Sequence, residues 1–368
     1  MDPKYILIGA DIVPTDTNYD KFISGDAKAL VGDRLFDILS GAEYRVFNLE
    51  TPLSDKEAPI LKTGPNLKAP SECINGYKAM GIDLLTVANN HTMDQGREAF
   101  LDTLATLTEN EIDYIGGGAS KEEAKRTKIV ELCGVKIGFI AFCEHEFSWV
   151  DDYGVGALGF DPLESLDDVS SLKSECDFVV ALYHGGRENY RYPSPLLQKT
   201  CRAIAKHGAD LVIAQHTHCI GARENYLGSE IVYGQGNMLF DHPFAQSPVN
   251  EGWLTSLLVK LNVDDRGVSI EYIPMEKCGE GVKYSDNPEI LENFAKRSAQ
   301  IAEEGFVKAT YTEYVMKNKE TFSHYMTHFA RAEELGTKSG AGVRNLLTCD
   351  PHREFIITYV SELHKLYK

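Results

Sequence analysis

Several features that this sequence lacks exclude whole classes of protein. Its eight cysteines include no CxxC pair, which argues against a zinc ribbon or the disulfide framework of a small secreted domain. No segment approaches the roughly 18 uninterrupted apolar residues that a membrane-spanning helix needs. The first residues, MDPKYILIGAD, also lack the basic and apolar regions of a secretory leader. We therefore expect a cytoplasmic protein with no membrane segment, whose cysteines are reduced and buried.

Basic residues are scarce as well. The chain of 368 residues has 37 Lys and Arg against 55 Asp and Glu, which gives a formal net charge of -18. Surfaces that bind nucleic acid or anionic lipid depend on clustered Lys and Arg, so we expect no nucleic-acid partner. An anionic small-molecule or polymer substrate remains compatible with this charge, because a bound metal ion can reverse the field locally. The sequence leaves a homo-oligomer open.

What the sequence does contain is a series of apolar runs of strand length. Their apolar character is continuous rather than alternating, which is typical of strands buried on both faces. Helix-like stretches at 96–111 and 194–209 lie between some of them and indicate βαβ units. The predicted strands span residues 5–11, 44–50, 82–91, 177–186, 210–218 and 230–237.

Two predicted hairpins interrupt this alternation, at 127–142 and 254–274. Parallel and antiparallel strands together predict a layered α/β sandwich. From about residue 286 the pattern changes to helical periodicity with abundant Lys, Glu and aromatic residues. We predict a domain of residues 1–280 followed by a helical C-terminal extension of residues 281–368.

Polar side chains stand where the predicted strands end. The carboxyl ends of strands in an open α/β sheet line the crevice where ligands bind, so we expect these side chains to converge although they span 200 residues of sequence. The side chains are Asp11, Glu50, Asn90 with His91, His184, and His216 with His218.

The chemistry of this set predicts a metal centre. Carboxylate, amide and imidazole donors without a thiolate suit one or two divalent ions, with Mn, Fe or Zn favoured. An acid between two ions can bridge them, and ions about 3.5–4 Å apart form the clamp of phosphoesterases. Such a pair would activate a water molecule as nucleophile.

Each residue taken singly also has a structural explanation. Asp11 or Glu50 alone is an ordinary turn or cap residue, the NNH stretch alone is a turn, and His184 alone is a loop histidine. His216 and His218 form a stronger signal, because alternate residues of an extended segment point to the same side. The hypothesis therefore depends on the combination.

The order of the motifs GAD, FNLETPL, VANNHTMDQG, LYHGGRE, QHTH and YGQGN resembles the CapA family. This is the family of poly-γ-glutamate capsule synthesis proteins, a branch of the calcineurin-like metallophosphoesterases. The similarity covers approximately residues 5 to 245. It implies a metallophosphoesterase-like α/β/β/α sandwich in four layers, with two mixed sheets flanked by helices.

The resemblance also implies roles for the residues that match its motifs. Asp11 and His218 would bind the first metal, Glu50 would bridge, and Asn90, His184 and His216 would bind the second. His91 would not be a ligand; it would be either the general acid that protonates the leaving group or the donor that stabilises the transition state. Asn237 and Glu188 match family residues near the site. Lys62, Arg97, Arg187 and Arg223 lie within or beside the motif loops, where they are either substrate-binding cations or ordinary solvated charges.

One departure from the superfamily is Val13, where a histidine commonly supplies a ligand to the first metal.

Three functions are compatible with these residues and with the resemblance. The first is a metal-dependent hydrolase in which metal-activated water attacks a phosphate ester or related anionic substrate. The second is the processing of γ-glutamyl amides or a part in poly-γ-glutamate synthesis. The third is a scaffold with a vestigial metal site, which Val13 favours and His91 disfavours.

Overall fold

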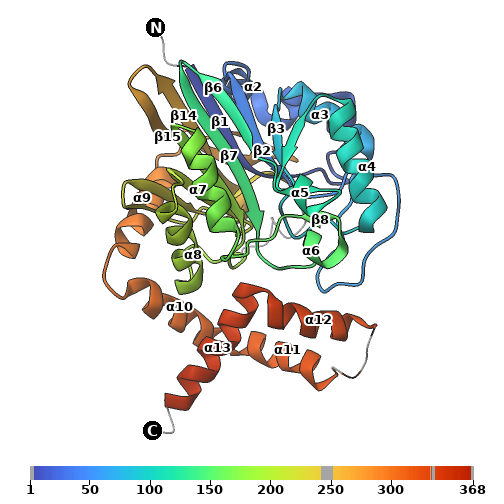
Figure 1. The fold of residues 1–368 in the computed structure, drawn as a ribbon, viewed down its shortest axis with the longest axis vertical. Helices are drawn as coiled ribbons and strands as arrows, with labels where there is room; N and C mark the ends of the chain where they lie inside the picture. The colour runs from blue at the N-terminus through green and yellow to red at the C-terminus, as the bar shows by residue number, and fades with distance from the viewer. Residues whose placement is uncertain (1–3, 242–251, 332, 334–335, 366–368) are drawn as a thin grey trace.

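The computed structural model describes residues 4–241, 252–331, 333 and 336–365. Its main body is a sandwich of two mixed β-sheets, and a group of helices lies beneath it in the view of Figure 1. The N-terminus and the C-terminus lie at opposite ends of the molecule. The predicted fold class is therefore confirmed.

The first sheet combines parallel and antiparallel pairs. Strand β1 pairs in parallel with β2 and β13 and antiparallel with β14. The order across the sheet is β16-β15-β14-β1-β2-β3-β4, with β13 attached to β1 off this path. Its strands are β1 (Lys4–Val13), β2 (Tyr44–Leu49), β3 (Leu84–Thr86), β4 (Asp113–Ile115), β13 (Asn237–Phe240), β14 (Thr255–Asp264), β15 (Gly267–Cys278) and β16 (Gly281–Tyr284).

The second sheet has the order β11-β12-β10-β9-β7-β6. Its centre is parallel, and each edge is an antiparallel hairpin. The strands are β6 (Lys128–Leu132), β7 (Val135–Cys143), β9 (Phe178–His184), β10 (Leu211–Gln215), β11 (Arg223–Tyr226) and β12 (Ser229–Tyr233). A small ladder of β5 (Gly117–Gly118) and β8 (Gly156–Ala157) lies beside the sheets.

Three apolar layers hold the sandwich together. The inner faces of the two sheets meet in one cluster, in which Ile8 and Val46 of the first sheet join Phe139, Val180 and Ile213 of the second. Two further clusters cover the outer faces with helices. Because the strands are buried on both faces, continuous apolar runs are the pattern that this fold requires.

Helices α2 (Ala27–Ser40), α3 (Ile74–Ala79) and α4 (Gly96–Glu109) cover the first sheet. Helices α7 (Ser165–Glu175) and α8 (Pro195–Lys206) cover the second. The predicted start of α8 is confirmed, since the Ser194 hydroxyl accepts a hydrogen bond from the Leu197 N–H. Short helical turns complete the body: α1 (Tyr19–Ser24), η1 (Ser71–Cys73), α5 (Lys121–Ala124) and α6 (Val150–Tyr153).

The predicted strand at 230–237 is in fact two strands in different sheets. Strand β12 ends at Tyr233 in the second sheet, and β13 begins at Asn237 beside β1 in the first. Gly234 and Gly236 lie between them with φ of 108° and 80°, a backbone region that glycine enters without strain. This crossing brings Asn237 opposite Asp11.

The C-terminal region is helical, as predicted. Helix α9 packs against the edge of the sandwich through Ile290 and Phe294, and the following helices form a separate cluster around Tyr311 and Phe355. The division at residue 280 stays a prediction, and β16 extends the first sheet just after it. The helices are α9 (Glu289–Ile301), α10 (Phe306–Lys317), α11 (Lys319–Ala330), α12 (Lys338–Thr348) and α13 (Asp350–Lys365).

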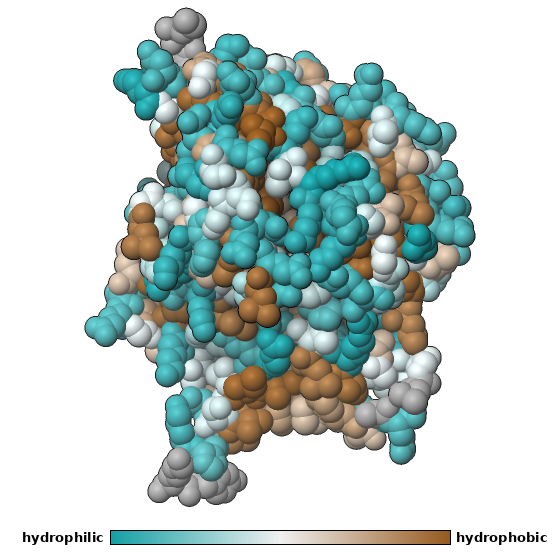
Figure 2. All heavy atoms as spheres, viewed as in Figure 1, coloured by the Kyte–Doolittle hydropathy of each residue, from teal (hydrophilic) through white to brown (hydrophobic). Residues whose placement is uncertain are grey.

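Apolar surface gathers over these last helices at the bottom of Figure 2. Leu347 of α12 and Ile357 and Val360 of α13 are exposed. None of the helices in the described part of the chain combines the length and the apolar character that crossing a membrane requires. The eight cysteines are free thiols. The prediction that they are buried is wrong for Cys133, which follows β6, and for Cys278, the last residue of β15, because both are exposed.

Candidate metal centre

The predicted donor residues meet at one place, where the carboxyl ends of strands from both sheets face each other. Asp11 lies near the end of β1, Glu50 directly follows β2, and His184 is the last residue of β9. Asn90 lies in the turn after β3, and His216 follows β10. The cluster therefore forms only when the two sheets have packed against each other.

Asp11 is fully buried and forms the floor of the cluster. Its Oδ1 accepts a hydrogen bond of 2.8 Å from the side-chain amide of Asn48, whereas its Oδ2 has no hydrogen-bond partner among the described residues. Two imidazoles face it: His184 Nδ1 lies 3.8 Å from Oδ1, and His218 Nδ1 lies 3.6 Å from Oδ2. A carboxylate oxygen is thus left open toward the histidines.

Glu50, Asn90 and His184 point at a common position. His184 Nε2 lies 3.1 Å from Glu50 Oε1 and 3.1 Å from Asn90 Oδ1. Within the part of the chain that the structure describes, neither oxygen of the Glu50 carboxylate has a hydrogen-bond partner, although the side chain is completely buried. Three donors from three separate segments therefore converge.

His216 and His218 join the cluster by a route that the sequence argument did not foresee. Strand β10 ends at Gln215, so the two histidines do not lie on an extended segment. Both have positive φ, 80° and 52°, in the left-handed region that costs a side-chain-bearing residue about 1–3 kcal/mol. Their ring centroids are 5.9 Å apart, and the His216 ring is 4.9 Å from that of His184.

The unpartnered atoms fit a divalent cation. Buried carboxylate oxygens without a donor cost free energy, and a metal ion is the partner that oxygen and imidazole donors share. The donor atoms of Glu50, His216 and His218 lie within 4.8 Å of one another, as do those of Asp11, Glu50 and His184. Glu50 belongs to both groups, which is the position of a bridging acid.

The pKa values follow from burial and from the neighbouring charges. Burial, together with repulsion from Glu50, raises the pKa of Asp11 to about 6, and burial raises that of Glu50. Burial lowers the pKa of His184 to about 4 and that of His216 to about 3, so both imidazoles are neutral at pH 7. Neutral imidazole is the form of histidine that binds metals.

His91 is held beside the cluster by a buried ion pair. Its Nδ1 lies 2.6 Å from Asp94 Oδ2, and Lys62 Nζ lies 2.6 Å from Asp94 Oδ1. With Nδ1 engaged, Nε2 is the other ring nitrogen, and the charge of His91 partly offsets the rise in the pKa of Glu50 that burial causes. Burial raises the pKa of Asp94, but the charges of His91 and Lys62 outweigh this effect and lower it overall.

The predicted substrate-binding residues have different surroundings. Lys62 is 2% exposed and also donates to the carbonyl of Asn90, so its ammonium group is engaged within the protein. Glu188 is open to solvent, with 53% of its side chain exposed and Oε1 4.0 Å from His216 Nε2. Arg97 is exposed, and Arg223 forms an ion pair with Glu230.

Arg187 turns toward the C-terminal helices. Its guanidinium donates to the hydroxyl of Tyr314 at 3.2 Å and to that of Tyr325 at 2.8 Å, and it lies over the ring of Phe355. These partners belong to α10, α11 and α13. The substrate roles of Lys62, Arg187, Glu188 and Asn237 stay predictions.

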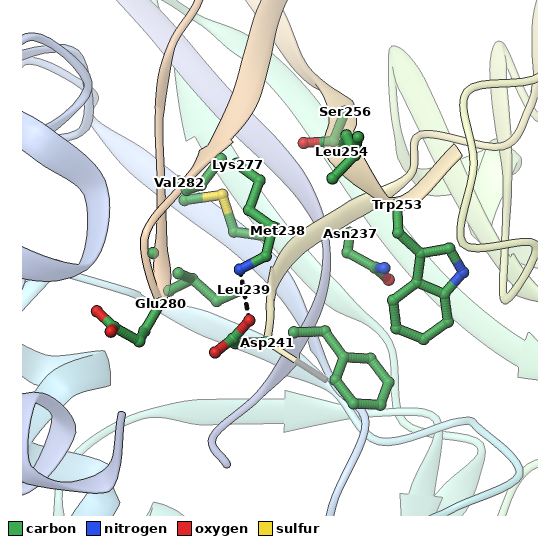
Figure 3. Close-up of a pocket in the computed structure, with 12 residues that line it drawn as sticks. Asn237, Met238, Leu239, Asp241, Trp253, Leu254, Ser256, Lys277, Glu280 and Val282 are labelled. Carbon is green, nitrogen blue, oxygen red and sulfur yellow. Dashed lines mark hydrogen bonds and ion pairs between the residues drawn. The ribbon is translucent and has the colours of Figure 1, made fainter. Parts of the chain in front are cut away.

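The side-chain amide of Asn237 contacts the imidazole ring of His218. Its Oδ1 is 2.8 Å from His218 Nδ1, an arrangement that fixes the ring with Nε2 directed away from the amide. Figure 3 shows the Asn237 amide turned toward the indole of Trp253, whose ring packs 4.6 Å from that of His218. Lys277 and Asp241 form an ion pair farther along the same hollow.

Sequence reasoning missed Asn48, which connects the donors. Its amide donates to Asp11 Oδ1 and lies 3.2 Å from His184 Nδ1, while its oxygen accepts from Thr86 and Asn89. A signal was present, because Asn48 and Glu50 alternate along one strand and therefore point to the same side.

Sequence reasoning also missed Glu144 and Glu146, which follow β7. Glu144 Oε1 lies 3.5 Å from His216 Nε2, and Glu144, Glu146 and His216 form a further group of donor atoms within 4.8 Å of one another. The stretch FCEHEF marks a strand end like the others. We assigned β7 to a hairpin, and this assignment hid its parallel pairing with β9.

A cavity of about 560 Å³ opens beside His216. The sandwich supplies one wall through Glu144, Glu146 and Glu188, and the C-terminal helices supply the other through Tyr314 and residues of α11 and α13. A second cavity of about 230 Å³ adjoins it and shares Glu146 and Glu188. The C-terminal helices thus form one wall of a cavity next to the candidate metal centre.

Val13 occupies the position where the superfamily commonly has a histidine. It is buried at the end of β1 and pairs with Phe240 of β13. The described residues place no imidazole at this point, and the imidazoles that face Asp11 are those of His184 and His218.

Comparison with known proteins confirms the resemblance seen in the motifs. The family model described as bacterial capsule synthesis protein PGA_cap matches residues 6–242, more than half of the chain. The chain is 28% identical over 251 residues to the capsule biosynthesis protein CapA of Bacillus anthracis, which covers 64% of this chain and 59% of that protein.

The chain is likewise 28% identical over 219 residues to the PGA biosynthesis protein CapA of Bacillus subtilis strain 168, covering 57% of this chain and 56% of that protein. It therefore spans less than two thirds of the length of these relatives. A hypothetical protein from Thermus thermophilus is 14% identical, with a TM-score of 0.47 that covers 74% of this chain and 100% of that one. On the match of the family model, the chain belongs to the family of bacterial capsule synthesis proteins.

Proposed function

We propose that this protein is a metal-dependent hydrolase that acts on a phosphate ester or a related anionic substrate. The observation that carries the proposal is the convergence of six donor side chains around carboxylate oxygens that have no partner among the residues described. A cavity of about 560 Å³ adjoins the cluster and offers room for a substrate. A purely structural site would need neither this cavity nor an oriented histidine beside it.

Asp11, Glu50 and His218 would hold one ion, and Glu50, Asn90, His184 and His216 would hold a second. Bound divalent ions supply Lewis acidity that activates water and neutralises the charge of an anionic substrate. Asn48 fixes the orientation of Asp11 and His184 through its amide. The left-handed backbone at His216 and His218 is strained. This conformation would direct both imidazole rings at the metal ions.

His91 would transfer the proton to the leaving group. Asp94 accepts the Nδ1 hydrogen and so leaves Nε2 to exchange a proton with substrate. The buried Lys62 balances the charge of Asp94, which keeps the carboxylate from drawing the proton away. In this role Lys62 positions the acid and does not contact substrate.

The second candidate is hydrolysis or handling of a γ-glutamyl amide. Membership in the capsule synthesis family and the names of the Bacillus relatives favour it. The ligand set does not separate the two reactions, because a metal-activated water attacks an amide carbonyl as well as phosphorus. A substrate panel separates them.

The test is metal analysis of the purified protein together with turnover of phosphomonoesters, phosphodiesters and poly-γ-glutamate. We expect chelation to abolish turnover and Mn²⁺ to restore it. His91→Ala should retain the metal and lower kcat by about 10²–10⁴-fold. His364→Ala, at an exposed position of α13, is the matched control and should behave as wild type.

Three outcomes decide between the hypotheses. Release of glutamate without phosphatase activity would replace the phosphoesterase proposal by the amide one. Stoichiometric metal without turnover of any substrate would favour a scaffold. A His91→Ala variant as fast as wild type would remove the assigned acid.

A further inference from the structure

A second cluster of metal-binding side chains lies where the C-terminal helices meet the sandwich. Glu146 comes from the loop after β7, whereas Cys349 follows α12 and His352 lies in the first turn of α13. The donor atoms of these three residues lie within 4.8 Å of one another. The cluster therefore joins two parts of the molecule that are more than 200 residues apart in the chain.

The imidazole and the carboxylate of this cluster lie at the spacing of two ligands of one ion. His352 Nε2 lies 3.6 Å from Glu146 Oε1, beyond hydrogen-bond length. Two donors at about 2.0–2.3 Å from one tetrahedral ion lie about 3.3–3.8 Å apart. The Cys349 thiol donates a hydrogen bond of 3.8 Å to Glu144 Oε1, so the Glu144 carboxylate is a fourth metal-binding group within reach of the cluster. Cys349 itself is 1% exposed.

The outer partners of the cluster also fit a metal site. The hydroxyl of Tyr325 lies 2.7 Å from His352 Nδ1, so the second ring nitrogen, Nε2, is the one that faces Glu146. A metal-bound histidine is usually held in this way through its other nitrogen. Asn345 fixes Glu146 with a hydrogen bond of 2.9 Å to Oε1.

Asn345 supplies a second, independent observation. It is 4% exposed and lines the cavity of about 230 Å³ together with Glu146 and His352. Its Oδ1 has no hydrogen-bond partner in the described ranges of the chain. A buried amide oxygen beside this cavity lacks a partner that a cation or its bound water would provide.

We propose that Glu146, Cys349 and His352 bind a divalent transition metal such as zinc at this junction. A thiolate, an imidazole and a carboxylate form a donor set typical of zinc or cobalt. The ion would fasten α12 and α13 to the loop after β7 and so close the cavity beside His216. The proposal does not depend on hydrolase activity.

Cobalt substitution tests the site, because it distinguishes the two metal centres by a thiolate. The first centre contains no cysteine among its donors, so a sulfur-to-cobalt charge-transfer absorption in the near ultraviolet that Cys349→Ser removes would arise at Cys349 and not at the first centre. We expect the full-length protein to show this absorption when titrated with Co²⁺, and Cys349→Ser to lose it. His352→Ala should weaken Co²⁺ binding at this site by at least tenfold.

Cys201→Ser is the matched control, because Cys201 is equally buried but packs within α8 against the second sheet. This variant should keep the absorption. Wild-type protein that binds Co²⁺ without any sulfur-to-cobalt absorption would overturn the proposal, and so would a Cys349→Ser variant that retains it. Either result leaves the proposed hydrolase function to be judged by its own assay.

Discussion

Two polar clusters adjoin the cavity of about 560 Å³, one through His216 and the other through Arg187, and they use their hydrogen-bonding capacity in opposite ways. At the carboxyl ends of the strands, both oxygens of Glu50 and Oδ2 of Asp11 are buried without donors from the described residues. On the side of the C-terminal helices, Arg187 distributes its N–H groups to Tyr314 and Tyr325. The carboxylate oxygens of the first cluster lack hydrogen-bond donors among the described residues, whereas the guanidinium of the second cluster has acceptors within the chain.

The difference separates a binding site from its support. A buried acceptor without a donor costs about 1–3 kcal/mol, which a fold bears only where a ligand compensates for it. A paired guanidinium costs little and fixes the geometry of the elements that it joins. We therefore expect substitutions in the two clusters to affect stability in opposite directions.

Glu50→Gln should have the largest effect on turnover. The change removes the acid shared by both donor groups, so metal affinity should fall by more than the 10–100-fold typical of outer partners, and activity should fall to the metal-free level. In metal-free protein the same change removes an unpartnered buried carboxylate. The free energy of unfolding of the metal-free variant should then exceed that of metal-free wild type by about 1–3 kcal/mol, which raises the denaturant concentration at the midpoint.

Glu57→Gln is the control for that experiment, because 80% of the Glu57 side chain is exposed. Denaturant unfolding with and without Mn²⁺ measures both effects. Wild type should gain about 2.7 kcal/mol at a free metal concentration 100 times Kd. If metal-free Glu50→Gln were less stable than metal-free wild type, the claim that the buried Glu50 carboxylate destabilises the protein without a cation would be wrong.

Asp94→Asn should destabilise the protein by about 3 kcal/mol, since it leaves the buried Lys62 without its counter-ion. The folded pKa of Asp94 lies below its unfolded value of about 3.9. The stabilisation by this carboxylate is therefore fully present above that pH and is lost as the pH falls through the folded pKa.

Unfolding of wild type and Asp94→Asn from pH 7 down to pH 3 measures this prediction. The stability difference should stay constant above about pH 5 and shrink below about pH 4. Asp102→Asn, at a half-exposed position of α4, is the matched control. A difference that grows on acidification would show that the pKa is raised instead.

Arg187→Ala should lower the free energy of unfolding by about 1–3 kcal/mol, because two tyrosine hydroxyls lose their donor and packing against Phe355 is lost. Metal content should not change. Arg266→Ala, at a turn where 86% of the arginine side chain is exposed, serves as control. Loss of metal from Arg187→Ala would erase the distinction between the two clusters.

Glu188→Gln should have the smallest effect on stability, within about 0.5 kcal/mol, because the side chain is half exposed. Its position at the wall of the cavity predicts a change in KM with kcat nearly unchanged. Steady-state kinetics with the substrate found in the panel measures this. An unchanged KM would remove Glu188 from the substrate-binding residues.

Much of this arrangement could be predicted from the sequence because strand ends are local signals. Buried strands appear as apolar runs, and the polar residue after each run marks the sheet edge where ligands gather. Asp11, Glu50 and His184 are brought together as that argument expects. The two hairpins and the helical stretch at 194–209 were also predicted, since turn residues and helical periodicity act within a few positions.

The rest depends on tertiary contacts that no local pattern encodes. Arg187 contacts Tyr325 across 138 residues, and Asn345 contacts Glu146 across 199. The left-handed turn at His216 is set by its surroundings, since neither residue type nor spacing requires it. Glu144 was missed because β7 belongs both to a hairpin and to the parallel centre of its sheet.

The pairing of β1 with β13, which sets Asp11 opposite Asn237, has a consequence for biosynthesis. The first strand emerges from the ribosome long before its neighbour, and closing so long a loop is slow. A newly made chain could therefore complete the candidate metal centre only after β13 has been synthesised. Added metal should then affect folding only from that point on.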